Sequence, residues 1–171
     1  MTLLEQEEYK ALRATIRERG TARVCIFAAG IAVWAALTVA TAAVSAPPVA
    51  TLVPLLVLVS SFEAVFALHV GVERVGRYLQ VHFDDGWEKA AMAFGRPRGA
   101  TIIDALFVVP FLVAALFNVI PALLRFPTPA ELIFVGGAHA LFVLRVFVAR
   151  QAAGRQRAID LERFQHIRKN A

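Results

Sequence analysis

The sequence predicts an all-α integral membrane protein with four transmembrane helices arranged as two helical hairpins. Three observations predict this class: 58% of the 171 residues are hydrophobic, only 18% are charged, and the apolar residues are concentrated in four blocks. A typical soluble domain is about 45–50% apolar and about 25% charged. The apolar excess is too large for a small soluble domain, which must cover itself with polar surface. The same excess excludes a disordered chain.

The four apolar blocks occupy residues 24–46, 49–72, 105–124 and 132–149. A helix needs about 20 mostly apolar residues to cross a bilayer, so the first three blocks are long enough. The fourth block is shorter and contains His139 and Arg145, so hydropathy alone makes it marginal. The outer connections between blocks are short, which predicts two tight hairpins joined by one longer segment.

The distribution of basic residues supports a fourth crossing. If all four blocks cross the membrane, 17 of the 18 Lys and Arg residues fall on one side, and Arg125 is the exception. Cytoplasmic loops carry the Lys and Arg excess, so both termini are expected in the cytoplasm. A three-span chain would export the basic C-terminal tail. Together with a composition rich in Arg and Ala, this predicts a multi-pass protein of a bacterial plasma (inner) membrane.

Three cytoplasmic segments are expected outside the spans: residues 1–22, 73–104 and 150–171. Thr2 and Glu5 fit a capping box and Gly20 fits a helix stop, which predicts an amphipathic helix over residues 3–19. The tail is expected to continue the fourth span as a basic helix.

The middle segment is expected to begin as a continuation of the second helix. No helix breaker follows the second block until Asp84-Asp85-Gly86, so that helix should project several turns beyond the membrane. Residues 86–94 then predict a short helix lying in the membrane interface. Residues 95–99 predict a turn.

Four ionisable residues within the spans form a candidate intramembrane polar cluster: Glu63, His69, His139 and Arg145. Such residues are costly in a bilayer, and they usually face the bundle interior and pair. Counting from Arg74 and Arg150 as cytoplasmic anchors places Glu63 level with His139. Counting from the outer turns places Glu63 level with Arg145, so both partners remain open. A carboxylate paired with an imidazole predicts a proton or cation site. The favoured alternative is an interhelical contact that locks the hairpins together.

A polar stripe follows on the second helix. Glu73, Arg77 and Asp84, with His69 and Gln80, repeat at spacings of four, four, three and four residues, which is one face of a helix. This face could bind a cytoplasmic partner or a cation. The favoured interpretation is a series of i,i+4 pairs.

The second and fourth blocks also resemble each other. Residues 63–74 and 139–150 are identical at six of twelve positions at an offset of 76, although the restricted alphabet makes this weak evidence. A true parallel repeat would place Glu63 opposite His139 and His69 opposite Arg145.

Enzyme and cofactor chemistry is not expected. The single cysteine, Cys25, excludes a disulfide framework and a cysteine metal site. His69 and His139 differ in depth by roughly 9 Å, which does not suit a bis-histidine haem. The turn from His82 to Glu88 is a compact group of hard ligands without a recognisable metal spacing, so catalysis there is the weakest hypothesis.

The net charge of +5 is accounted for by the tail that begins at Arg145. This basic tail is attracted to anionic lipid head groups rather than to nucleic acid. The basic residues beyond the fourth span are Arg150, Arg155, Arg157, Arg163, Arg168 and Lys169.

The sequence therefore predicts a structural or accessory subunit of a membrane assembly, docking partners or lipids through cytoplasmic helices. Its expected partners are membrane lipids and other membrane subunits or further copies of the chain. The alternative is a small oligomeric transporter or channel for protons or cations that uses Glu63, His139 and Arg145.

Overall fold

The computed structural model describes residues 1–94 and 101–170, and these residues form helices and short turns without a strand. The elements, in chain order, are α1 (Leu3–Ala43), the short 3-10 helix η1 (Pro48–Thr51), α2 (Leu52–His82), α3 (Gly86–Phe94), α4 (Thr101–Leu123) and α5 (Pro129–Asn170). The predicted turn at residues 95–99 lies outside the described part of the chain.

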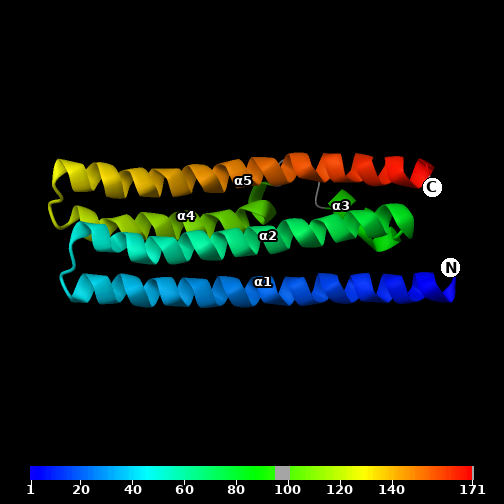
Figure 1. Ribbon diagram of the computed structural model, residues 1–171, viewed down its shortest axis with the longest axis horizontal. Coiled ribbons are helices and arrows are strands. Elements are labelled where there is room, and N and C mark those ends of the chain that lie inside the picture. Colours follow the sequence, from blue (N-terminus) through cyan, green and yellow to red (C-terminus); the bar gives the residue numbers. More distant parts are fainter. Residues whose placement is uncertain (95–100, 171) are drawn as a thin grey trace.

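The four long helices lie along one common axis (Figure 1). Both termini lie at one end of the bundle, which we call the terminal end, and the connections α1–α2 and α4–α5 lie at the opposite end, the turn end. Helix α2 is central, because it packs against α1, α4 and α5 and also contacts α3. The chain is therefore an all-helical bundle in which each short connection joins two antiparallel helices.

Three helices are long and apolar enough to cross a membrane: α1, α2 together with η1, and α5. In α4 the described apolar stretch, Val108–Leu123, is shorter. Many large apolar side chains on the outside of the bundle are exposed, including Leu56, Leu116 and Phe134. A soluble protein rarely leaves so large a set of apolar side chains in water. The fold is compatible with a helical membrane protein.

Helix α1 begins as predicted but does not end as predicted. The capping box is present, because the Thr2 hydroxyl accepts from the Glu5 backbone at 3.2 Å and the Glu5 carboxylate accepts from the Thr2 backbone at 2.6 Å. The predicted stop at Gly20 is wrong, since α1 continues through it to Ala43. One internal glycine costs only about 1 kcal/mol of helix stability. Packing of α1 along α2 outweighs that cost.

The predicted helical continuations of α2 and α5 and the predicted short helix at residues 86–94 are confirmed. Helix α2 continues to His82, α3 occupies residues 86–94, and α5 continues without a break from its apolar part to Asn170. At 1.5 Å per residue, α1 and α5 are each about 60 Å long, twice the ~30 Å thickness of a bilayer core. Roughly half of each helix therefore extends past an apolar layer.

The apolar core lies between α2, α4 and α5. Leu58, Phe111 and Val146 are fully buried, and the Phe62 ring makes edge-to-face contacts with Phe111 and Phe142. Helix α1 packs closely against α2 at Gly30, where an added Cβ would lie 2.1 Å from the Ser61 Oγ. This close approach requires glycine.

Arg125 lies at the turn end, in the connection between α4 and α5. Its guanidinium donates hydrogen bonds to the backbone carbonyls of Thr41 and Ala42, at 3.3 and 2.9 Å. These carbonyls belong to the last turn of α1 and also accept from the backbone amides of Ala46 and Ser45, at 3.3 and 3.4 Å. Arg125 therefore ties the α4–α5 connection to the end of α1.

Candidate functional site

Glu63 pairs with Arg145 in the middle of the bundle. The Arg145 Nη2 lies 2.7 Å from the Glu63 Oε2, which joins α2 to α5. The Arg145 guanidinium also lies over the Phe66 ring, 5.5 Å from its centroid. Both charged side chains are 40% exposed on the bundle surface. Of the two partners left open by the sequence, the structure pairs Glu63 with Arg145.

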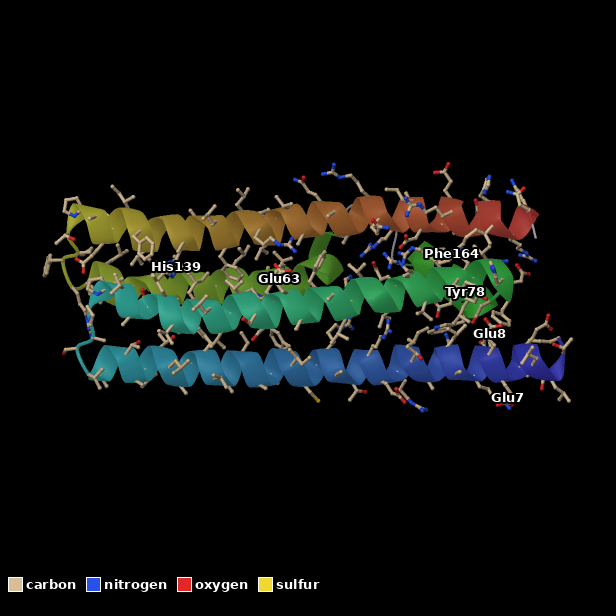
Figure 2. All side chains as sticks on the ribbon, viewed as in Figure 1. Glu7, Glu8, Glu63, Tyr78, His139 and Phe164 are labelled. Atoms are coloured by element: carbon tan, nitrogen blue, oxygen red, sulfur yellow. The ribbon has the colours of Figure 1, made fainter. Side chains whose placement is uncertain are left out.

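His139 lies closer to the turn end than Glu63 and does not contact it (Figure 2). Its ring is buried and contacts Asn118 of α4, with 2.9 Å between the His139 Nε2 and the Asn118 Nδ2. The other ring nitrogen, Nδ1, lies 2.8 Å from the Val135 carbonyl, which can only accept. The network therefore requires a neutral imidazole with its proton on Nδ1.

Asn118 is the centre of a buried polar network that joins α1, η1, α4 and α5. Its amide nitrogen donates to His139 and, at 2.8 Å, to the Thr51 carbonyl. Its carbonyl oxygen accepts from the Trp34 indole at 3.1 Å and from the Thr38 hydroxyl at 3.3 Å. Asn118 is completely buried, and all of its hydrogen-bonding capacity is used.

The register between α2 and α5 explains this pairing. Contacts between the two helices join residues 82, 84, 86 and 87 positions apart, at Glu63–Arg145, Glu73–Arg157, Arg74–Asp160 and Val81–Arg168. The repeat proposed from the sequence has an offset of 76. Helix α5 is therefore shifted by at least six residues from that alignment. The alignment's pairs, Glu63 with His139 and His69 with Arg145, do not form.

Glu73 is the centre of a charged cluster nearer the terminal end. The Arg157 guanidinium contacts both carboxylate oxygens of Glu73: its Nη2 lies 2.8 Å from Oε1, and its Nε donates to Oε2 at 3.0 Å. Arg77, which is buried, places its Nη2 at 3.8 Å from the same carboxylate. His69 lies 3.6 Å from Glu73 and accepts at Nδ1 from Arg23 of α1 at 2.9 Å. The cluster thus connects α1, α2 and α5.

The polar stripe does not form one continuous binding face. His69, Glu73 and Arg77 make the i,i+4 contacts just described, whereas Asp84 lies beyond the end of α2, is exposed and pairs with Lys89. Gln80 is partly buried and lines a small recess between α2 and α5. Only the first three members therefore share an environment.

The turn after α2 serves as a helix cap. Asp85 accepts from the backbone amides of Trp87 and Glu88 at 2.9 and 3.3 Å, which caps α3, and from the Tyr9 hydroxyl at 2.9 Å. Burial alone would raise the pKa of Asp85, but these hydrogen bonds and the nearby Arg13 charge together lower it. The hydrogen bond with Asp85 in turn raises the pKa of Tyr9.

The two aspartates of this turn point to different partners. The hydrogen bond from Lys89 lowers the pKa of Asp84, whereas Asp85 faces α1. Within the described residues, no three His, Cys, Asp or Glu side chains are grouped as metal ligands would be. The His82 ring lies tilted against the Tyr78 ring, with 4.2 Å between their centroids, and its edge-to-face neighbour is Phe164. Tyr78 also donates to Glu8 of α1 at 2.8 Å, so this end of the bundle is joined by aromatic and polar contacts (Figure 2).

The basic tail divides into two groups of side chains. Arg157 contacts Glu73 as described above, and Arg168 donates to the Val81 carbonyl. The other four make no ion pair with the described residues. Arg150 and Arg155 border the groove described next, and Arg163 and Lys169 are exposed.

A groove of about 850 Å³ lies between α2, α4 and α5, where the apolar part of α5 meets its basic part. Phe62, Val65 and Val146 line its apolar portion. Arg150 and Arg155 border its polar portion. Neither residue could be assigned to a groove from the sequence, because that assignment depends on the register of α5 against α2.

Asn118 was absent from the sequence-based candidates, although it was the single strongly polar side chain in the third apolar block. A lone amide in a charge-free span is itself a signal, since a polar group in a membrane must find a partner. The sequence-based candidates concentrated on ionisable groups and so passed over it.

The described part of the chain is all-helical, and three of its helices are long and apolar enough to cross a membrane, which is compatible with a helical membrane protein. No protein-family model matches the chain, and neither the curated proteins nor the solved structures contain a significant match.

Proposed function

We propose that this chain is a small four-span membrane protein with both termini in the cytoplasm, acting as a structural or accessory subunit of a membrane assembly. In this proposal α1, α2, α4 and α5 each cross the bilayer of a bacterial plasma (inner) membrane. The extensions of α1, α2 and α5 form a charged cytoplasmic bundle that docks partners.

Two features support four crossings. Helix α4 has 23 residues, or about 34 Å at the helical rise, which is enough for a ~30 Å bilayer core. Both connections at the turn end are short, and both termini lie at the opposite end. With this topology, all Lys and Arg residues outside the spans except Arg125 lie on one side.

The observation that carries the proposal is the pairing of polar groups in the apolar part of the bundle. Glu63 is paired with Arg145, and His139 is held by Asn118 and by its own helix. A proton-carrying site must exchange its proton with water, whereas both nitrogens of His139 are already occupied within the bundle. These residues join α2 to α5 and α4 to α5 through polar contacts, and such contacts favour a structural role over transport.

The part of the bundle beyond the apolar segments supplies the docking surface. Its acidic residues Glu73 and Asp160 are used in contacts with Arg157 and Arg74, between α2 and α5. These contacts hold the extensions together and leave basic side chains of α5 exposed. A fixed, basic surface of this kind suits acidic partners at the membrane.

The test is gentle detergent extraction of the tagged full chain followed by native mass spectrometry. The proposal predicts stable complexes with other membrane subunits. It would be contradicted by a pure homo-oligomer that carries protons in dye-loaded proteoliposomes and loses that flux with Glu63→Gln. That result would support the alternative, a small proton- or cation-linked transporter.

A matched control separates loss of flux from loss of fold. Glu131 is a partly buried acid at the turn end, where it caps α5 by accepting from Thr128. Glu131→Gln removes the same charge away from the middle of the bundle. A flux that falls equally with both substitutions would reflect a weakened bundle, and the structural proposal would stand.

A further inference from the structure

The groove between α2, α4 and α5 changes character along its length. Its floor is formed by Phe62, Val65 and Phe66 of α2 and by Val146 of α5, and three of these four side chains are buried. At 850 Å³ it is within the ~300–1,000 Å³ range of small-molecule sites. An apolar floor of this size suits hydrocarbon.

The other portion of the groove is basic. Arg150, Arg155 and Arg157 border it together with Gln151, and no Asp or Glu is among the described residues that line it. Arg157 is held by Glu73, whereas Arg150 and Arg155 have no acidic partner in the described part of the chain. Two guanidinium groups are therefore available to an anion.

The change from apolar to basic occurs within one helical turn. Val146 and Arg150 are four residues apart on α5, so they share a face and are separated by about 6 Å along the axis. Gly154 continues the same face, and an added Cβ there would meet no atom within 4 Å. A ligand in this groove must therefore combine an apolar chain with an anionic group about one helical turn away.

We propose that the groove binds one anionic phospholipid, with its acyl chains against the apolar floor and its phosphate at Arg150 and Arg155. The proposal rests on the membrane topology proposed above, which places Arg150 at the first cytoplasmic position after the fourth span. Basic pockets between transmembrane helices on the cytoplasmic side are suited to phospholipid head groups. A free phosphate ion could contact the arginines of the basic portion but would leave the apolar portion of the groove unfilled.

The experiment uses the delipidated full chain in detergent and native mass spectrometry. The probes are phosphatidylglycerol, phosphatidylcholine with the same acyl chains, and inorganic phosphate. We expect one phosphatidylglycerol per chain, weaker retention of phosphatidylcholine, and no competition from inorganic phosphate at equal concentration. Competition by phosphate at the same concentration as the lipid would overturn the proposal in favour of a phosphate site.

Charge-matched variants test the headgroup. Each arginine near anionic lipid contributes about 1 kcal/mol, so Arg150→Gln with Arg155→Gln should weaken phosphatidylglycerol binding roughly 30-fold. Arg163→Gln with Lys169→Gln removes the same charge from exposed positions of α5 outside the groove. Equal weakening by the two pairs would show diffuse attraction to the tail and overturn the proposal.

Space-matched variants test whether the lipid lies in the groove. Gly154→Phe should narrow the groove between Arg150 and Arg155 and weaken retention of the single lipid, whereas Gly137→Phe on the same helix lies in open space outside it and should retain the lipid. Unchanged binding by Gly154→Phe would overturn the proposal. Recovery of other membrane subunits is measured separately, so failure of the lipid site and failure of the subunit proposal are distinguishable.

Discussion

Substitution of Glu63 by Gln should destabilise the bundle, because among the described residues it leaves the Arg145 guanidinium with only the Phe66 ring as a partner. An unpaired charge at the centre of a membrane helix costs about 2.5–3.5 kcal/mol on insertion scales. Both side chains are 40% exposed, so Arg145 can partly relax toward the interface. We therefore expect a loss of about 2 kcal/mol in the free energy of unfolding.

The assay is the loss of helicity with increasing mole fraction of sodium dodecyl sulfate in mixed micelles. Arg145→Met should cost a similar amount, because it leaves Glu63 without a charged partner. The double variant Glu63→Gln/Arg145→Met should recover most of the loss, since replacing both ions is less costly than removing one. If the effects of the single variants add within about 0.5 kcal/mol in the double variant, the pair contributes no coupling and the reasoning is refuted.

Three further predictions concern the ends and the interior of the bundle. Asn118→Leu should lower the free energy of unfolding by about 2 kcal/mol, because interhelical hydrogen bonds in membranes contribute about 0.6 kcal/mol each on average and four are lost; an unchanged transition in the same assay would contradict this. Gly30→Ala should destabilise the bundle by about 1–3 kcal/mol through its clash with Ser61, and Ser61→Gly in the same chain should restore stability. The lowered pKa of Asp85 means that its contribution is complete above its ordinary value of 3.8 and is lost as the pH falls through the lower folded value. The thermal midpoint in detergent should therefore fall in that acid range, and Tyr9→Phe should reduce the fall; identical acid profiles for the two chains would argue against it.

The long helices were predictable because their signals are local. Apolar blocks, the Thr2–Glu5 capping box and the Asp84-Asp85-Gly86 breaker each act over a few residues. The same signal at Thr128 and Glu131 marks the start of α5, where the capping contacts are present at 2.9 and 3.3 Å. The helix stop predicted at Gly20 was wrong because the packing of α1 along α2 outweighs the low helix propensity of glycine. A long-range contact of this kind leaves no local sequence pattern.

The partner of Glu63 was not predictable because it depends on helix register. Arg74 and Arg150 looked like equivalent anchors, but Arg74 contacts Asp160, ten residues farther along α5. Counting from the turn end did place Arg145 level with Glu63, but nothing in the sequence selected one count over the other. The position of Arg150 at the groove was not predictable for the same reason, because the groove is lined by residues of both α2 and α5.

Cysteine accessibility tests the four-span topology most directly. With Cys25 replaced by Ala, single cysteines are introduced as Val44→Cys and Phe126→Cys in the two connections and as Ala90→Cys and Gln165→Cys toward the terminal end; all four positions are exposed. Intact cells are treated with a membrane-impermeant maleimide before and after permeabilisation. The account predicts labelling of the first two before permeabilisation and of the last two only afterwards. Protection of the cysteine at position 126 together with outside labelling at position 165 would contradict it, because the chain would then cross the membrane three times.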